Sequence, residues 1–299
     1  MNKTRNQDHY EVEGLGTAGS PLIMAVADGH GSAVHARSHL GSRFAVDLFV
    51  QEARLFAALA QPRGEERPPS LAWLMRYAEY AFPRQLVSAW RDRVLGNWER
   101  ASSHGEPPVR DEEKLLLYGS TFVGAVLTPR VFAAWQLGDG ELTIVGDDGV
   151  AVPLAPQEAD LGDETESLCT PEAWLRVRTH WAPVTAPSRA PRLVALSTDG
   201  LSKSFASDMG FRQFMTGLDE RLSAEGTERV RAALPQWLGK ASQHSGDDTT
   251  LVAAWHTTED PRDPHDPEAT AEMTSPAAPP VPAVPVDMED LRDPYRSDE

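Results

Sequence analysis

The stretch Pro21-Leu22-Ile23-Met24-Ala25-Val26-Ala27-Asp28-Gly29-His30-Gly31 joins a short apolar run to a polar turn. Residues 21–27 are too few for a typical helix and are apolar throughout, which predicts a strand buried on both faces. Asp28-Gly29 would end this strand, because aspartate tolerates tight backbone geometry and glycine supplies positive φ. The sequence therefore places Asp28 at the end of a buried strand.

Four aspartates share such a setting, each in a small or polar segment beside an apolar run. They are Asp8 in Asn6-Gln7-Asp8, Asp28, Asp199 in Ser197-Thr198-Asp199-Gly200-Leu201, and Asp247 in Gly246-Asp247-Asp248-Thr249-Thr250. Any single Asp-Gly pair is also a common turn signal. Carboxylates that strands bring to one point repel each other unless cations neutralise them, and hard divalent cations prefer oxygen ligands. With no cluster of His or Cys beside them, the set predicts Mg²⁺ or Mn²⁺.

Composition describes a globular chain of 299 residues with 40% hydrophobic content, enough for one large domain or two ordinary ones. No apolar stretch approaches the ~20 residues that span a bilayer, and the polar start lacks the apolar core of a signal peptide. A cytoplasmic location is the expectation. The single cysteine, Cys169, excludes an intramolecular disulfide and a zinc site built from several cysteines.

The net charge of −17 argues against nucleic acid or an anionic membrane as the main partner, because both would be repelled. Much of this charge lies at the C-terminal end, where residues 257–299 hold 12 acidic and 3 basic side chains. The same segment is rich in proline and poor in large apolar groups. We expect residues 259–299 to be a disordered acidic and proline-rich tail after a domain of residues 1–258.

Hydrophobic spacing predicts the elements of this domain. We expect a helix over 33–60 with Ser32 as its N-cap, and a second helix over 71–90 that Pro83 kinks or breaks. A polar loop is expected over 96–113, and an antiparallel meander of three strands over 120–127, 131–137 and 141–145. Residues 147–190 contain five prolines and are expected to be an irregular inserted flap. The remaining expected elements are a strand over 192–197, helices over 208–223 and 227–242, and a strand over 249–255.

The ordered set of motifs resembles the PP2C-type (PPM) metal-dependent protein serine/threonine phosphatases, and bacterial members in particular. The motifs are Asn6-Gln7-Asp8, Asp28-Gly29-His30-Gly31, Gly119-Ser120-Thr121, Gly138-Asp139, Thr198-Asp199-Gly200-Leu201 and Asp247-Asp248-Thr249-Thr250. Each motif alone is weak, and their order and spacing carry the resemblance, which covers residues 1 to about 256. It implies an α+β fold: a four-layer α-β-β-α sandwich of two antiparallel sheets flanked by helices.

The resemblance also implies a site with two Mn²⁺ or Mg²⁺ ions and a weaker third one. The residues that match the metal ligands are Asp8, Asp28, Gly29 through its carbonyl, Asp199 and Asp247, with Asp139 joining Asp199 at the third ion. In the family's chemistry a water that bridges the two main ions attacks phosphorus directly. His30 matches a proposed general acid, for which its near-neutral intrinsic pKa is suited, and a solvated loop histidine is the alternative.

The chain departs from the family pattern at several positions. Lys3 stands where an arginine usually grips the substrate phosphate, and lysine lacks the bidentate fork of arginine. Gln7 replaces a frequent glutamate, and Glu141 follows Gly140 where a serine-arginine pair is usual. Asp248 would become the ligand in place of Asp247 if the motif shifts by one residue; the Asp-x-x-Thr spacing favours Asp247.

The expected function is hydrolysis of phosphoserine and phosphothreonine in protein substrates, which include a serine/threonine kinase or its targets. Two alternatives remain open: a catalytically impaired module of the same fold that binds phosphoproteins or acts as a scaffold, and a phosphohydrolase for small molecules. Neither nucleic acid nor a membrane is an expected partner. Ser120 and Thr121 are interpreted as packing residues, and His35 and His39 as part of a solvated helix face.

Overall fold

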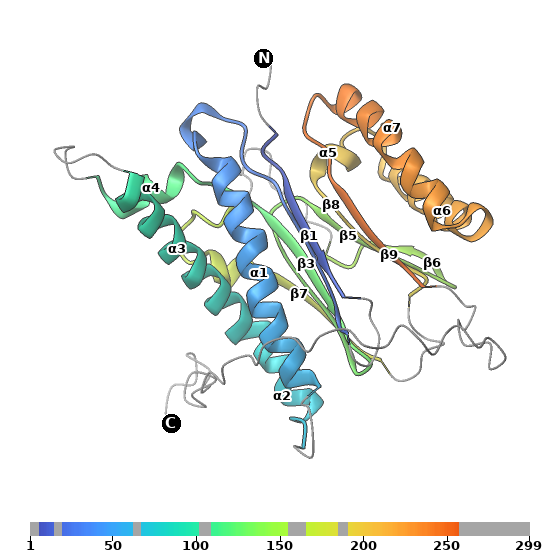
Figure 1. The fold of residues 1–299 in the computed structure, drawn as a ribbon, viewed down its shortest axis with the longest axis horizontal. Helices are drawn as coiled ribbons and strands as arrows, with labels where there is room; N and C mark the ends of the chain where they lie inside the picture. Colours follow the sequence, from blue (N-terminus) through green and yellow to red (C-terminus); the bar gives the residue numbers. More distant parts are fainter. Residues whose placement is uncertain are drawn as a thin grey trace, which may run out of the picture.

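The computed structural model describes residues 6–14, 20–61, 67–101, 109–154, 166–184 and 191–256. Their strands form two antiparallel sheets (Figure 1). The first has the order β1-β2-β3-β4-β7, with β1 His9–Glu13, β2 Leu22–Ala27, β3 Phe122–Leu127, β4 Val131–Leu137 and β7 Arg178–Pro183. The second has the order β6-β5-β8-β9, with β5 Glu141–Gly146, β6 Gly149–Ala151, β8 Leu193–Ser197 and β9 Leu251–Trp255.

Helices cover the outer faces of both sheets (Figure 1). The first sheet is covered by α1 Ser38–Ala60, α2 Leu71–Arg76, a π-helical turn Tyr77–Ala81, α3 Phe82–Ala101 and α4 Asp111–Leu116. The second is covered by α6 Asp208–Glu225 and α7 Thr227–Ser245, with the short α5 Asp199–Ser202 beside α7. Short 3₁₀ turns lie at Ala33–His35 and Ala173–Arg176. The predicted four-layer α-β-β-α sandwich is confirmed.

Strand β2 shows how the layers are held together. All six of its residues are buried, as predicted. Because successive side chains of a strand point to opposite faces, Ile23, Ala25 and Ala27 join the core under α1 and α3. The alternate residues Leu22, Met24 and Val26 pack between the two sheets. A third apolar layer fills the space between the second sheet and α6 and α7.

The predicted three-stranded meander is wrong for its third strand, β5. Strands β3 and β4 pair as predicted, but β5 lies in the other sheet and pairs with β8. The free edge of β4 is taken by β7, a strand inside the segment 147–190 that was expected to be irregular. Strand β6 lies in the same segment and forms a hairpin with β5. The centre of the expected flap, 155–165, and residues 185–190 lie outside the described residues.

Three predicted helix boundaries also differ from the structure. Ser32 makes no side-chain cap, because a 3₁₀ turn follows it and α1 begins only at Ser38. The expected loop over 96–113 is helical at both ends, where α3 continues to Ala101 and α4 begins at Asp111. Apolar contacts explain both, since Trp98 packs against the core and Leu115 is fully buried.

Pro83 does not end its helix, which instead contains a π-helical turn just before this proline. The π turn comes just before it, where the Phe82 N–H donates to the carbonyl of Tyr77 five residues earlier. In that register Pro83, which has no N–H, leaves the Ala78 carbonyl without a helical donor. The indole Nε1 of Trp135 donates to this carbonyl at 2.7 Å. The predicted kink is thus a π turn stabilised from β4.

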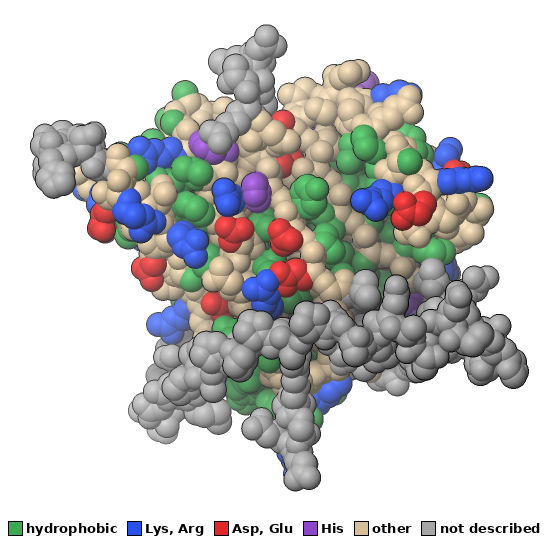
Figure 2. All heavy atoms as spheres, in the orientation of Figure 1, with side chains coloured by type: hydrophobic (Ala, Val, Ile, Leu, Met, Phe, Trp, Pro, Cys, Tyr) green, Lys and Arg blue, Asp and Glu red, His purple; other side chains and the backbone are tan. Residues whose placement is uncertain are grey.

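Among the described residues, no helix is both long and apolar enough to cross a membrane. On the face shown in Figure 2, acidic and basic side chains lie near one another on the left and right parts of the molecule. The expected tail, 259–299, lies outside the described residues.

Candidate metal centre and active site

Asp8 and Asp28 meet at one edge of the first sheet. Asp8 immediately precedes β1, Asp28 immediately follows β2, and the two strands are antiparallel with His9 opposite Ala27. The pairing register therefore brings the start of one strand and the end of the other side by side. Strand pairing, and not proximity in sequence, brings these two aspartates together.

The second sheet brings its own acidic residues to the same edge. Ser197, at the end of β8, is opposite Leu251 at the start of β9 and Glu141 at the start of β5. Asp199 follows β8, and Asp139 precedes β5. The segment Asp247-Asp248-Thr249-Thr250 leads into β9. In Figure 2 acidic side chains are visible in the recess between the two halves of the sandwich, at the upper edge of the molecule.

Hydrogen bonds of Asp8 join the two sheets at this point. Its Oδ2 accepts from the Thr198 hydroxyl at 2.9 Å and from the Thr250 hydroxyl at 2.8 Å. The backbone N–H of Gln7 donates to Asp248 Oδ2 at 2.9 Å. Thr198 and Thr250 belong to the quoted motifs, but no role was predicted for them because their partner is far away in the sequence.

The Gly119-Ser120-Thr121 motif fixes the backbone of Asp28. The Ser120 hydroxyl donates to the Asp28 carbonyl at 2.8 Å, and the Thr121 N–H donates to the same carbonyl at 2.9 Å. Thr121 Oγ1 accepts from the Asp28 N–H at 3.3 Å. The two hydroxyl residues therefore position the strand end, in agreement with the packing interpretation.

The clustered carboxylates shift one another's pKa values. Burial, then repulsion from Asp8 and Asp199, raises the pKa of Asp28 to about 10. Burial also raises the pKa of Asp8. Burial and repulsion from Asp139 raise the pKa of Asp199 to about 7, although Lys203 opposes this shift. Burial is the main cause of all three shifts, and repulsion between neighbouring carboxylates adds to it.

The donor chemistry of this cluster fits hard divalent cations. Asp8 Oδ1 and Asp199 Oδ1 are buried and have no hydrogen-bond partner, so each has a lone pair facing no donor. In the part of the chain that the structure describes, no group of three or more His, Cys, Asp or Glu side chains is arranged to hold a metal ion. Oxygen atoms of the kind that Mg²⁺ and Mn²⁺ prefer are thus present at this edge. In the described residues they are arranged for hydrogen bonding and not for coordination of a metal ion.

A family model for protein phosphatase 2C matches residues 1–239. The chain belongs to the protein phosphatase 2C family. It therefore carries a protein phosphatase 2C domain, and the resemblance drawn from its motifs is confirmed.

Solved structures share the fold of this phosphatase domain at low sequence identity. A bacterial serine phosphatase is 14% identical with a TM-score of 0.53, over 87% of this chain and 95% of that chain. Stp1 from Staphylococcus aureus is 14% identical with a TM-score of 0.51, over 86% and 91%. PstP/Ppp from Mycobacterium tuberculosis is 16% identical with a TM-score of 0.51, over 86% and 95%. A comparison with curated proteins found no significant match.

His30 of the phosphatase domain lies near this edge. Its backbone N–H donates to the Gly119 carbonyl at 3.1 Å, and its ring centroid lies 4.7 Å from that of His35. Burial, together with His35, lowers the pKa of His30 to about 4, against an opposing effect of Asp139. His35 lies in the 3₁₀ turn before α1 and not on the helix itself, and its Nδ1 is 2.5 Å from the Leu116 carbonyl oxygen.

Both candidates for the last acidic ligand lie in this cluster. The charge of Asp247 raises the pKa of Asp28, and that of Asp248 raises the pKa of Asp8. The close approach of this segment to α5 requires Gly200, because a Cβ there would overlap the Asp248 carbonyl oxygen. Lys3, the remaining predicted residue, lies outside the described residues.

Two charged residues of the site were not predicted. Lys203 contacts Asp199 Oδ2 and lies 3.5 Å from Asp139 Oδ2. Glu141 Oε2 accepts from the Ser197 hydroxyl at 3.1 Å, and burial raises the pKa of Glu141 to about 8. A sequence signal existed for Lys203, because it follows Asp199 by four residues in a segment that turns into a helix.

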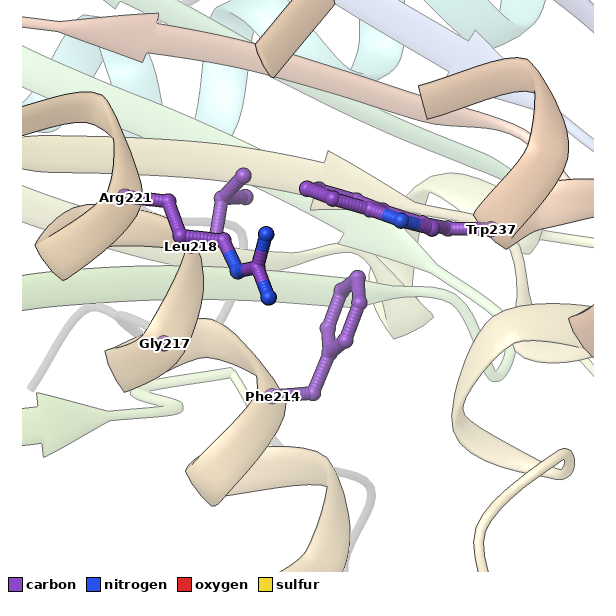
Figure 3. Close-up of a pocket in the computed structure, with 5 residues that line it drawn as sticks. All are labelled: Phe214, Gly217, Leu218, Arg221 and Trp237. Atoms are coloured by element: carbon purple, nitrogen blue, oxygen red, sulfur yellow. The ribbon is translucent and has the colours of Figure 1, made fainter. Parts of the chain in front are cut away.

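A separate cavity of about 250 Å³ lies between α6 and α7 (Figure 3). It is lined by Phe214, Gly217, Leu218, Arg221 and Trp237. The Arg221 guanidinium lies 5.1 Å from the centroid of the Trp237 ring, a cation–π contact. None of these residues belongs to the acidic cluster, so the phosphatase chemistry is assigned to the sheet edge and not to this cavity.

Proposed function

We propose that this chain hydrolyses phosphoserine and phosphothreonine in proteins, in a reaction that requires two Mn²⁺ or Mg²⁺ ions. The observation that carries the proposal is the gathering of Asp8, Asp28 and Asp199 at one sheet edge, where two buried carboxylate oxygens have no hydrogen-bond donor. Membership of the protein phosphatase 2C family supports the reaction type. The physiological substrates would include a kinase or the proteins that it phosphorylates.

Asp8, Asp28, Asp199 and Asp247, with the carbonyl of Gly29, would hold the cations. When bound, the cations would lower the pKa of a water molecule and neutralise negative charge on the phosphoryl oxygens. Thr198 and Thr250 orient Asp8 by donating to its Oδ2, which leaves its Oδ1 for a cation. We retain Asp247 over Asp248 because of the Asp-x-x-Thr spacing of the motif, since one carboxylate oxygen of each accepts a backbone N–H, Asp247 Oδ1 from Asp248 and Asp248 Oδ2 from Gln7.

His30 is the proposed proton donor to the leaving serine or threonine oxygen. Its low pKa means that the imidazole is neutral at pH 7 before substrate binds. An arriving phosphate dianion would raise this pKa, because negative charge nearby favours the imidazolium form. Lys3 is proposed to bind the phosphate as a point charge.

A second function, binding of phosphoproteins without turnover, is favoured by one specific observation. The Lys203 ammonium lies between two of the acidic residues, and the described side chains are not arranged to hold a metal ion. This alternative predicts that the chain retains phosphopeptides and releases no phosphate at any Mn²⁺ concentration. A small-molecule phosphohydrolase would instead release phosphate from p-nitrophenyl phosphate and leave phosphopeptides intact.

Phosphate release from a phosphothreonine peptide and from p-nitrophenyl phosphate separates the three functions. We expect both substrates to be hydrolysed with Mn²⁺ and neither with excess chelator. Replacing a residue that only hydrogen-bonds to a metal ligand lowers metal affinity or activity by roughly 10–100-fold. Asp28→Asn or Asp199→Asn changes a ligand itself and should lower turnover by roughly 100-fold or more. Asp148→Asn, at an exposed turn, is the matched control and should behave as wild type. Full activity in chelator or in both ligand variants would overturn the proposal.

A further inference from the structure

Lys203 is held against two acidic residues that come from different strands. Asp199 opens α5 after β8, and Asp139 precedes β5. Lys203 is the C-cap of α5, four residues after Asp199; it contacts Asp199 Oδ2, and its Nζ lies 3.5 Å from Asp139 Oδ2. The ammonium group thus bridges the two carboxylates.

The two carboxylate oxygens of Asp199 have different surroundings. Oδ2 is taken by Lys203, whereas Oδ1 is buried and has no hydrogen-bond partner. An ammonium group is a compact cation with three donors, so it can bridge two carboxylates as a small metal ion does, although it cancels one negative charge where a divalent ion cancels two. Lysine is protonated at neutral pH in ordinary surroundings, so both contacts join opposite charges.

We propose that Lys203 is a built-in cation that occupies the position between Asp139 and Asp199, where a further divalent ion would otherwise bind. The inference rests on the proposed function, because it concerns the same acidic edge. A tethered ammonium occupies this position at every metal concentration, whereas a weakly bound ion would leave it in dilute metal. The outer pair of carboxylates therefore holds a single positive charge permanently, and only the ions bound by Asp8, Asp28 and the free side of Asp199 respond to metal supply.

Binding of Mn²⁺ to the purified full chain tests this inference, with stoichiometry read by calorimetry and free Mn²⁺ by electron paramagnetic resonance. Lys203→Met removes the charge at similar length and should bind one Mn²⁺ more per chain than wild type. Lys203→Arg keeps the charge and should retain the wild-type number. Lys203→Met combined with Asp139→Asn should lose the additional ion. Lys114→Met removes a lysine paired with Asp111 on α4 at 2.7 Å and should match wild type.

The possible results separate this inference from the proposed function. Equal stoichiometry in wild type and Lys203→Met overturns the role of Lys203 and leaves the proposed function standing if both bind at least two ions. No binding in wild type together with binding in Lys203→Met supports the role of Lys203 and contradicts a metal-dependent enzyme. No binding in either protein overturns both.

Discussion

Among single residues, Asp8 is the candidate ligand that its neighbours orient most directly, because two threonine hydroxyls donate to its Oδ2 and its Oδ1 has no hydrogen-bond partner. Its identity as a candidate ligand follows from its small polar setting before β1. Its hydrogen bonds do not, because Thr198 and Thr250 reach it from the other sheet. Lys203 could have been noticed from its spacing to Asp199, but its contact with Asp139 depends on how β5 and β8 pair.

Thr250→Val tests whether the threonine hydroxyls orient Asp8. The change keeps the shape of the side chain and removes the 2.8 Å hydrogen bond to Asp8 Oδ2. We expect Mn²⁺ affinity to weaken by roughly 10–100-fold, the range typical of residues that orient a metal ligand. Thr216→Val is the control, since the Thr216 hydroxyl only donates to a carbonyl of its own helix at 3.1 Å. Unchanged affinity in Thr250→Val would remove Thr250 from the site.

Asp28 predicts an unusual dependence of stability on pH in the metal-free protein. Its pKa is raised to about 10 in the folded state, against 3.8 for an unperturbed aspartate. The folded state therefore binds more protons than the unfolded state between these values, so the free energy of unfolding decreases as pH rises through this window. Melting temperatures in chelator should decline from pH 5 to pH 9.

Asp28→Asn should make this decline shallower, because an amide does not titrate. Some decline should remain, since the pKa values of Asp199 and Glu141 are raised to about 7 and about 8. Asp148→Asn, at an exposed turn, should keep the wild-type slope. A slope that is the same in Asp28→Asn and wild type would show that Asp28 is not the dominant buried acid.

Among the helices and strands, the hydrophobic pattern predicted which elements exist better than it predicted which strands pair. Strand β2 and helices α6 and α7 appear near their predicted positions, because their apolar periodicity is clear. Strand β7 was missed because it lies in a proline-rich segment, and at the edge of the sheet its Pro183 is tolerated. No local sequence signal indicates that β5 belongs to the second sheet. Its position depends on distant strands, because β7 pairs with β4 and β8 pairs with β5.

The contact between α5 and the segment before β9 predicts opposite effects of two glycine changes. Gly200→Ala forces a Cβ into the Asp248 carbonyl, so it should destabilise the fold by roughly 1–3 kcal/mol and weaken Mn²⁺ binding. Gly217→Ala, on α6 with no atom near its Cβ position, should stabilise by about 0.5–1 kcal/mol through helix propensity. Urea unfolding measures the stability of both variants. An unchanged free energy of unfolding in Gly200→Ala would contradict the close approach of Gly200 to the Asp248 carbonyl.

At the scale of the whole molecule, the site exists because two sheets end at the same edge. Three apolar layers hold the four layers of the sandwich together, and the acidic residues occupy strand ends where no apolar packing is needed. The order of the motifs predicted this architecture through resemblance to a family, whereas composition alone predicted only a globular chain. Apart from the spacing of Lys203 to Asp199, the side-chain positions at the edge had no signal in the sequence, because they depend on the packing of both sheets.

Deletion of residues 260–299 is expected to leave the melting temperature within about 2 °C of the full chain and phosphatase activity nearly unchanged, because such an acidic, proline-rich segment buries little apolar surface. The family match ends at residue 239, before this segment. Differential scanning calorimetry and phosphopeptide assays of both forms provide the comparison. A large loss of stability would mean that the segment packs on the domain.

The central claim is that carboxylates from both sheets gather to bind divalent cations at one edge. Anomalous diffraction from crystals grown with Mn²⁺ tests it most directly, because the Mn²⁺ signal locates each ion independently of the protein. The account predicts two Mn²⁺ peaks at ligating distance from Asp8, Asp28, Asp199 and the Gly29 carbonyl, with Lys203 still between Asp139 and Asp199. Crystals that contain Mn²⁺ and show no peak at this edge would contradict it.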